Sequence, residues 1–202
     1  MVQIRELKVE GAYELTPQSF HDHRGLFLSP YQQELFLDHT GHRLFPVAQC
    51  SLSRSHRAVA RGIHFTATPP GMAKFVYSAQ GRALDIIVDT RVGAPTYGQW
   101  DSVLLDQRDF RALYLPVGVG HLFVSLADDT VVCYLLSTEY VPANELAISP
   151  TDPRLRLPLP TEFDLVLSER DRTAPTLDEA ERAGILPDYA ACRQLSLAWE
   201  AA

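Results

Sequence analysis

Short stretches of alternating apolar and polar residues dominate the middle of the chain, from about residue 45 to 140. A period of two is typical of strands with one buried face, and the Gly, Pro and Asp residues between the stretches indicate turns. Residues 74–79 and 83–89 flank Gly81, a pattern that predicts a β-hairpin. Further strands are predicted at residues 99–105, 111–115, 121–126 and 130–137. Short strands at this spacing favour a sandwich or barrel over a parallel sheet covered by helices.

Helical patterns lie mostly near the two ends of the chain. Thr176 and Glu179 have the spacing of a capping box, which predicts a helix over residues 177–183 that Gly184 ends. A weaker helical pattern covers residues 32–38. The many prolines in the last third of the sequence are typical of an irregular segment that wraps around the strands. The sequence contains no repeat, linker or low-complexity tract, so residues 1–202 are predicted to form one domain.

The charges are unevenly distributed along this acidic chain. The formal net charge of −7 disfavours a protein that binds nucleic acid or an anionic membrane through its overall charge. Residues 54–91 nevertheless hold six cations and two acids, whereas residues 139–202 hold twelve acids and six cations. A solvated face is the ordinary interpretation of such a run. The alternative is a local basic patch that binds an anionic ligand.

Targeting signals and cysteine motifs are not evident in the sequence. No stretch approaches the roughly 20 apolar residues of a membrane-spanning helix, and the start of the chain lacks the apolar region of a secretory signal. We therefore expect a cytoplasmic protein. Cys50, Cys133 and Cys192 are too far apart for a C-x-x-C pair, and we expect three reduced thiols.

Residues 114–121 contain the P-x-G-x-x-H spacing of the second cupin motif, which ends at His121 and usually supplies a metal ligand. The first cupin motif would supply H-x-H and then a Glu seven residues before a Gly. Here His64 stands alone, and Lys74 occupies the position seven residues before Gly81. An ammonium group cannot replace a carboxylate ligand, and two imidazoles are fewer ligands than metal cupins use. The sequence thus predicts a cupin-type jelly roll, an all-β fold with short peripheral helices, and no bound metal.

Three side chains of this predicted barrel suit the removal of a proton beside a carbonyl group. Enolisation needs a base, a positive group near the developing oxyanion, and an acid that returns a proton. His64, Lys74 and Tyr134 fit these three tasks, and Lys74 is one of only two lysines in the chain. Each residue taken singly is more often structural: a satisfied core histidine, an edge-strand lysine or a packed tyrosine.

Six segments of the chain form a specific pattern when they are taken in order: ARGIHF (60–65), PGMAK (70–74), LDIIVD (84–89), PTYGQW (95–100), YLPVG (114–118) and LSERD (167–171). Together they resemble the dTDP-4-dehydrorhamnose 3,5-epimerase family, and within it the branch that makes deoxysugars for antibiotics and other natural products. The similarity extends from about Phe20 to Tyr189. It implies a cofactor-independent, homodimeric jelly-roll enzyme that epimerises a dTDP-4-keto-6-deoxyhexose at C3 and/or C5, the two carbons beside the C4 ketone.

The resemblance also implies the roles of the reacting side chains. His64 would be the base and Asp171 its carboxylate partner. Lys74 would stabilise the enolate oxygen, and Tyr134 would deliver a proton from the opposite face of the sugar. Asp85 is a second acidic candidate, ranked below Asp171, because its position allows a structural or lysine-pairing role equally well.

A further set of residues is implied to bind the nucleotide. FHDHRGLF (20–27) resembles the family segment that crosses to the neighbouring subunit, with Phe20 and Phe27 near the thymine and Arg24 at the diphosphate. The alternative for the two phenylalanines is a place in the hydrophobic core. Residues 1–45 are accordingly expected to pack on the partner subunit. The other implied substrate contacts are Arg61, which would face the diphosphate from the barrel, and Ser29, Gln49, Ser51, His121 and Tyr140.

The chain departs from the family pattern at four places. Ser29 stands where many members have a Glu that contacts the thymine, and Ser51 stands where Asn is frequent. Leu122 replaces the Gly that usually follows the motif histidine, and Leu157 replaces an aromatic residue before Pro158. These changes affect which nucleobase the protein is expected to select and whether C3, C5 or both are inverted. The likeness to the antibiotic branch slightly favours a C5-acting or otherwise restricted enzyme.

Three alternatives remain open at this level. One is a C5-only or C3-only epimerase that acts on a dTDP-4-keto amino- or dideoxysugar. Another is a metal-dependent cupin oxygenase or isomerase, which Lys74 and the missing H-x-H oppose. The third is a nucleotide-sugar binder without catalysis, which is disfavoured because the predicted base, its partner, the cation and the phenol are all present.

Overall fold

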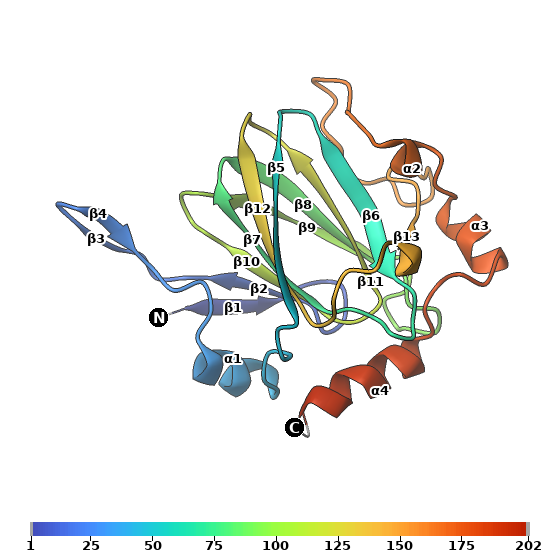
Figure 1. The fold of residues 1–202 in the computed structure, drawn as a ribbon, viewed down its shortest axis with the longest axis horizontal. Coiled ribbons are helices and arrows are strands. Elements are labelled where there is room, and N and C mark those ends of the chain that lie inside the picture. The colour runs from blue at the N-terminus through green and yellow to red at the C-terminus, as the bar shows by residue number, and fades with distance from the viewer. Residues whose placement is uncertain (1, 201–202) are drawn as a thin grey trace.

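A computed structural model describes residues 2–200 and shows two antiparallel sheets that face each other (Figure 1). The six-stranded sheet has the order β1 (Gln3–Glu6), β2 (Tyr13–Thr16), β10 (Ala112–Leu115), β7 (Lys74–Gln80), β12 (Thr130–Leu136), β5 (Gln49–Ser55). The five-stranded sheet has the order β13 (Glu145–Ala147), β6 (Ala60–Thr66), β11 (Val119–Ser125), β8 (Arg82–Asp89), β9 (Trp100–Asp106). This double-sheet arrangement with peripheral helices confirms the predicted all-β jelly roll.

The space between the sheets is filled by apolar side chains from alternate strand positions. Successive side chains of a strand point to opposite faces, so every second residue reaches the interior. The strand residues of this core include Ile87, Leu105, Leu113, Leu115, Phe123 and Val132. At one end of the barrel the inward positions become polar, with Lys74 on β7 and His121 on β11. The same alternation that builds the core therefore places chemistry-bearing groups at that end.

The predicted hairpin around Gly81 is wrong in its pairing, although both of its strands are present. β7 pairs with β10 and β12, whereas β8 pairs with β9 and β11 in the opposite sheet. Gly81 has a φ of +78° and lies against Thr130, where an added Cβ would approach the Thr130 Oγ1 to 2.6 Å. The chain turns a corner between the sheets at this glycine instead of folding back on itself.

Helices cover the outer faces of the two sheets. α1 (Gln33–Thr40) and α4 (Tyr189–Glu200) pack on the six-stranded sheet, and α3 (Leu177–Arg182) packs on the five-stranded one (Figure 1). The capping box that begins α3 at Thr176 is confirmed, and Gly184 follows its end. None of the helices among residues 2–200 combines the length and the apolar character that crossing a bilayer requires. Cys50, Cys133 and Cys192 are free thiols.

A two-stranded hairpin, β3 (Phe20–Asp22) and β4 (Gly25–Phe27), projects away from the body of the protein (Figure 1). Phe20 and Phe27 face each other across it and are 57% and 71% exposed. The alternative that these two phenylalanines belong to the core is therefore wrong. Large exposed aromatic side chains on a projecting arm are typical of a surface that a second chain covers.

A β-bulge in β6 changes which residues face the interior. His64 pairs with His121, but Arg61 pairs with Phe123, so the two residues of β6 between these pairs lie opposite a single residue of β11. In a regular strand, Arg61 and His64 would point to opposite faces because they are three positions apart. The extra residue brings both side chains to the same face. Gly62 lies in the bulge with a φ of +132°, and a Cβ there would come within 2.3 Å of the His121 carbonyl oxygen.

Replacing Gly62 with alanine is expected to destabilise the protein and to disturb the face that Arg61 and His64 share. The new methyl group would collide with the backbone of β11 and would require a φ that side chains rarely adopt. We expect a loss of about 3 kcal/mol in the free energy of unfolding, measured by urea denaturation. Gly184→Ala is the matched control, because Gly184 also has a positive φ, of +66°, but an added Cβ there has no neighbour within 4 Å. The comparison therefore isolates the effect of the collision. Equal stability of the two variants would contradict the role of the bulge.

Candidate active site

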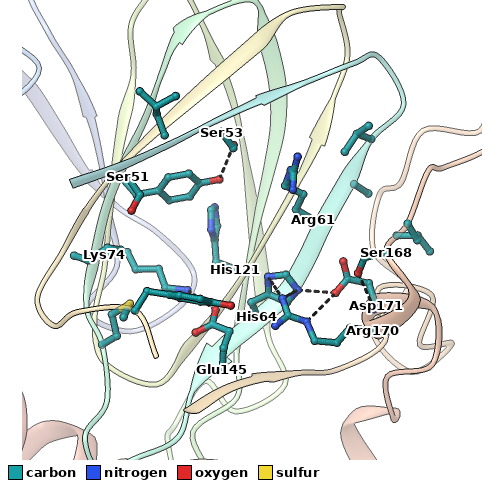
Figure 2. A pocket seen from close by; sticks show the side chains of 18 of the residues that line it. Ser51, Ser53, Arg61, His64, Lys74, His121, Glu145, Ser168, Arg170 and Asp171 are labelled. Atoms are coloured by element: carbon teal, nitrogen blue, oxygen red, sulfur yellow. Dashed lines mark hydrogen bonds and ion pairs between the residues drawn. The ribbon is translucent and has the colours of Figure 1, made fainter. Parts of the chain in front are cut away.

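A cavity of about 680 Å³ opens at the polar end of the barrel, between β5, β12 and β7 on one side and β6 and β11 on the other. Side chains from the C-terminal part of the chain complete its rim (Figure 2). The cavity brings together nine residues that the sequence predicted for one site: Gln49, Ser51, Arg61, His64, Lys74, His121, Tyr134, Tyr140 and Asp171.

His64 and Asp171 form a close pair at the rim of the cavity. Nε2 of His64 lies 2.6 Å from Oδ1 of Asp171, whose side chain is only 2% exposed. Asp171 is held in place because its backbone N–H donates to Oγ of Ser168, the N-cap of α2 (Glu169–Arg172), at 3.1 Å. A carboxylate in this position fixes the orientation of an imidazole ring and stabilises the ring when it gains a proton.

Arg170 is a neighbour of this pair that the sequence analysis missed, although it lies within the LSERD segment. Its Nη2 lies 2.9 Å from Nε2 of His64, and its Nε lies 3.8 Å from Oδ1 of Asp171. An Nε2–H that donates to Asp171 has no lone pair for Arg170, so the guanidinium acts on His64 mainly through its charge. For the pKa of His64, burial is the largest influence and lowers it, Asp171 raises it, and the cations Arg170 and Lys74 lower it further.

The balance of these effects keeps the His64 pKa below its ordinary value of 6.5. The pKa of Asp171 is also below its usual range: burial raises it, but the bonds to His64 and Ser168 and the charge of Arg170 outweigh burial. At neutral pH the pair is therefore a neutral imidazole beside a carboxylate. This is the form in which His64 can accept a proton.

The pH dependence of kcat/KM should report the protonation of His64 in the free enzyme. Because a base must be unprotonated, activity should fall as the pH decreases through the lowered pKa, with an acid limb below pH 6.5. In Asp171→Asn the influence that raises this pKa is lost, so the limb should move to lower pH while the plateau falls about 100-fold. In Arg170→Gln a lowering influence is lost, so the limb should move to higher pH. Shifts in the same direction for both variants would contradict this electrostatic picture.

Lys74 is buried at the base of the cavity and faces an acidic side chain. Its Nζ lies 3.7 Å from Oε1 of Glu145 on β13, and both side chains are 8% exposed. Oε2 of Glu145 also accepts a hydrogen bond of 3.1 Å from Thr66. Glu145 was not among the sequence predictions because it begins a three-residue strand in the irregular C-terminal segment. The contact holds a buried cation at the base of the cavity, where low exposure to solvent strengthens its effect on an anionic oxygen.

Tyr134 projects into the cavity from β12, on the sheet opposite His64. Its hydroxyl lies 3.4 Å from Oγ of Ser53 on β5 (Figure 2). Burial is the largest influence on the Tyr134 pKa and raises it far above the ordinary value, and the nearby Asp85 raises it too, whereas Ser53 and Arg61 lower it. The phenol is therefore protonated at neutral pH and can act as a proton donor.

The polar face of β5 lines another part of the cavity wall. Gln49, Ser51 and Ser53 alternate with outward-facing residues, so all three reach the interior. Gln49 donates to Oγ of Ser51 at 2.7 Å and accepts from the backbone N–H of Tyr140 at 2.8 Å. Arg61 on β6 also lines the cavity, and its Nε donates to Oγ of Ser55 at 3.2 Å. Together these groups present amide, hydroxyl and guanidinium donors, which suit a phosphorylated ligand.

The remaining predicted binding residues lie away from this cavity. Phe20, Arg24 and Phe27 belong to the projecting hairpin, where Arg24 pairs with Asp22 at 2.5 Å. Ser29 follows the hairpin and does not line the cavity either. Within one chain, the structure therefore separates these four residues from the nine that it brings together.

Asp85 does not pair with Lys74, which corrects one of its two predicted roles. Its Oδ2 lies 2.8 Å from Nε2 of His121, and it is completely buried on β8. β8 places Asp85 on the same face as Ala83 and Ile87, toward the interior, while Lys74 pairs with Glu145 instead. His121 thus has a carboxylate partner of its own below the cavity.

The arrangement suits proton transfer at carbon. A neutral imidazole and a protonated phenol lie on opposite walls, with an ammonium group between the two sheets at the base of the cavity. Within residues 2–200, His, Cys, Asp and Glu side chains do not gather in any group of three or more that could hold a metal ion. The imidazole, the phenol and the ammonium group are side chains that suit acid–base catalysis with electrostatic stabilisation of an oxyanion.

The sequence of the chain is similar to those of several sugar-nucleotide epimerases. The sequence model of the family described as dTDP-4-dehydrorhamnose 3,5-epimerase matches residues 6–179. The chain is 46% identical over 189 residues to a dTDP-4-dehydrorhamnose 3,5-epimerase of Mycolicibacterium smegmatis, a match that covers 94% of this chain and 92% of that protein. It is 44% identical to a dTDP-4-dehydro-6-deoxyglucose 3-epimerase of Streptomyces bikiniensis, with 93% of this chain and 95% of the relative covered.

Solved structures show the same relationship in three dimensions. NovW, a 4-keto-6-deoxy sugar epimerase from the novobiocin cluster of Streptomyces spheroides, superposes with a TM-score of 0.90 at 45% identity, covering 95% of this chain and 96% of NovW. ChmJ, a 3'-monoepimerase of Streptomyces bikiniensis solved with dTDP-quinovose, gives a TM-score of 0.91 at 42% identity, with 97% and 98% covered. The resemblance seen in the sequence is thus confirmed, and the chain belongs to the dTDP-4-dehydrorhamnose 3,5-epimerase family.

Proposed function

We propose that this carbohydrate epimerase inverts C3 of a dTDP-4-keto-6-deoxyhexose by acid–base chemistry at the residues of the cavity. The observation that carries the proposal is the placement of His64 and Tyr134 on opposite walls, with Lys74 between them. Inversion requires that a proton leaves one face of a carbon and that another arrives on the opposite face. An acid and a base on facing sheets satisfy this requirement.

The first half of the reaction takes place at the His64 wall. The neutral imidazole removes the proton from the carbon beside the ketone, and Asp171 stabilises the imidazolium that forms. The electrons of the broken C–H bond move to the ketone oxygen. Lys74 stabilises the resulting enolate oxygen, because its buried ammonium group already occupies the cavity before the charge develops.

The second half takes place at the Tyr134 wall. The phenol gives its proton to the same carbon from the opposite face, and the enolate electrons return to that carbon. Its hydroxyl is oriented by Ser53 at 3.4 Å. His64 has then gained one proton and Tyr134 has lost one, so the atoms balance and the enzyme must exchange protons with its surroundings before the next turnover.

C3 is the position that the relatives favour. The names of the curated relatives include 3,5-epimerases and 3-epimerases, so inversion at C3 is common to both groups. The slight preference for C5 that the sequence suggested stays a prediction without support from these names. The replacement of Asn by Ser51 lies on the cavity wall, beside Gln49, and is a candidate for the change that limits the positions at which the sugar reacts.

We also propose a homodimer of single-domain chains in which the hairpin β3–β4 enters the neighbouring subunit's cavity. Phe20 and Phe27 form an exposed apolar surface on the hairpin, of the kind that a partner covers, and they do not line the cavity of their own chain. In the partner's cavity they would stack on the thymine, and Arg24 would bind the diphosphate. A diphosphate-linked sugar does not cross a bilayer unaided, which supports a cytoplasmic location for the reaction.

A mixture of two inactive variants should recover activity if the hairpin acts in the partner's site. His64→Ala removes the base, and Arg24→Ala removes the phosphate contact of the arm. In an equal mixture that exchanges subunits, about half of the dimers are mixed, and each mixed dimer contains one site with both residues intact. Activity should therefore recover to about a quarter of the parent value. An equal mixture of Arg24→Ala with His56→Ala, which changes an exposed histidine outside the cavity, controls for the effect of mixing. If activity does not recover after subunit exchange, the hairpin does not act in the partner's site.

The direct test of the reaction is incubation with dTDP-4-keto-6-deoxyglucose in heavy water, followed by measurement of deuterium at each carbon. Incorporation at C3 with inversion supports the proposal, and additional incorporation at C5 would identify a 3,5-epimerase. Binding of dTDP with no incorporation at either carbon would support a non-catalytic binder. A stoichiometric metal ion that is required for incorporation would revive the metal-dependent alternative.

A further inference from the structure

A second His–Asp pair consists of His121, which lines the cavity, and Asp85 behind it, and neither residue takes part in the proton transfers described above. Asp85 is completely buried, and its Oδ2 accepts a hydrogen bond of 2.8 Å from Nε2 of His121. Its other oxygen, Oδ1, is buried without a hydrogen-bond partner in the part of the chain that the structure describes. A carboxylate that is shielded from water is costly unless a cation faces it. A protonated His121 would compensate this charge, so the pair offers a place where a proton can be held.

His121 lies between the two groups that exchange protons with the sugar. It is the direct cross-strand neighbour of His64, and its ring meets the ring of Tyr134 edge to face, with the ring centres 6.0 Å apart. Figure 2 shows His121 in the middle of the cavity, with Lys74 and His64 around it. Among residues 2–200 the His121 side chain makes its hydrogen bond through Nε2, which leaves Nδ1 for a water molecule in the cavity.

The proposed reaction leaves a phenolate at Tyr134 and an imidazolium at His64 after each inversion. The phenolate is held in a buried position, where a negative charge is poorly stabilised. While the sugar ring lies between the two walls, it blocks a direct proton transfer from His64 to Tyr134. A proton donor that reaches Tyr134 from within the cavity would restore the phenol before the product leaves.

We propose that the Asp85–His121 pair returns a proton to Tyr134 after each turnover, an inference that rests on the proposed roles of Tyr134 and His64. The imidazolium of His121 gives its proton to the phenolate oxygen through a bridging water. Neutral His121 then takes a proton from the water that enters as the product leaves, and His64 releases its extra proton to the same water. One proton is released and one is taken up, so the resting enzyme is restored.

The test compares a single turnover with steady-state turnover in Asp85→Asn and His121→Asn. With enzyme in excess, each variant starts with a protonated Tyr134, so the product should form within about threefold of the parent rate. With substrate in excess, the missing return step should lower kcat at least about tenfold. The time course should show a burst of about one product per site before the slow phase.

Two measurements separate this role from a structural one. Added imidazole should accelerate the slow phase of His121→Asn, because it can replace the missing proton carrier. The double variant Asp85→Asn/His121→Asn leaves no uncompensated buried charge, so it should remain folded by circular dichroism and show the same burst. His56→Asn is the matched control, because His56 forms an exposed His–Asp pair with Asp128 at 3.9 Å outside the cavity. This control should retain the parent's kinetics in both regimes.

The outcomes distinguish the two proposals. An equal decrease of the single-turnover and steady-state rates would mean that His121 acts in binding or in the inversion itself, and would overturn the proton return. Parent-like kinetics in both variants would also overturn it. If the parent protein forms no product even in a single turnover, the proposed epimerisation fails instead, whatever the variants do.

Discussion

Replacing His64 with alanine is expected to abolish both deuterium incorporation and epimer formation. His64 is the neutral, proton-accepting group on its wall of the cavity, because burial and the nearby cations hold its pKa below the ordinary value. Without it no group removes the proton from the carbon, and no enolate forms. We expect both rates to fall about 10⁴-fold. The measurement is the amount of deuterium at C3 and of inverted product after incubation in heavy water.

The His64 experiment needs a control for folding and one for the histidine itself. His56→Ala removes an exposed histidine outside the cavity and should leave both rates unchanged. A thermal unfolding curve for His64→Ala should resemble that of the parent, since the His64 side chain is partly exposed to the cavity. Incorporation within about tenfold of the parent rate would assign the base to another residue.

Replacing Tyr134 with phenylalanine should separate proton removal from inversion. The ring remains packed against the inner core, and only the hydroxyl beside Ser53 is lost. His64 can still remove the proton and return a deuteron to the same face, so incorporation should stay within about tenfold of the parent. Inverted product requires the proton from the opposite face and should fall about 1,000-fold.

The comparison for this variant is Tyr97→Phe, which removes a phenol that bonds to Glu181 far from the cavity residues. Tyr97→Phe should form product at the parent rate. Unaltered product formation in Tyr134→Phe would remove Tyr134 from the role of proton donor. Loss of incorporation together with loss of product would show that the hydroxyl is needed for substrate binding or for deprotonation.

Local patterns predicted the strands well, because alternation is a property of the residues within one strand. The pairing of the strands depends on residues far apart in the sequence. The two strands around Gly81 have the pattern of a hairpin, yet each finds its partners in a different sheet. The short strands β1 to β4 and the C-terminal helix α4 carry weaker periodicity, and packing against the rest of the protein decides their structure.

The site residues that lie in segments resembling the family could be predicted from the sequence. His64, Lys74 and Asp171 stand in segments that resemble the family, and the structure places all three at one cavity. Arg170 could have been found in the same way, since it precedes Asp171 in its segment. Ser53 also had a signal, because it continues the period of two that Gln49 and Ser51 begin.

Two contacts of the site had no signal in the sequence. Glu145 lies on a three-residue strand within the irregular C-terminal segment, and only the folded chain brings it to Lys74. The contact between Asp85 and His121 could not be predicted from the sequence either, because the two residues lie on different strands of the same sheet. Pairs of this kind are fixed by sheet register, which alternation within a strand does not reveal.

The bulge in β6 connects the candidate site to a segment, residues 148–165, that does not line the cavity. Ile63, displaced from the ladder with β11, exchanges backbone hydrogen bonds of 3.3 and 3.1 Å with Ile148 instead. The backbone of Ile148 thus stabilises the bulge of β6. The rate of hydrogen exchange at the Ile63 amide would report how stable this contact is. Substitutions in the proline-rich stretch that follows Ile148 would then change the turnover rate, even when every residue of the cavity is unchanged.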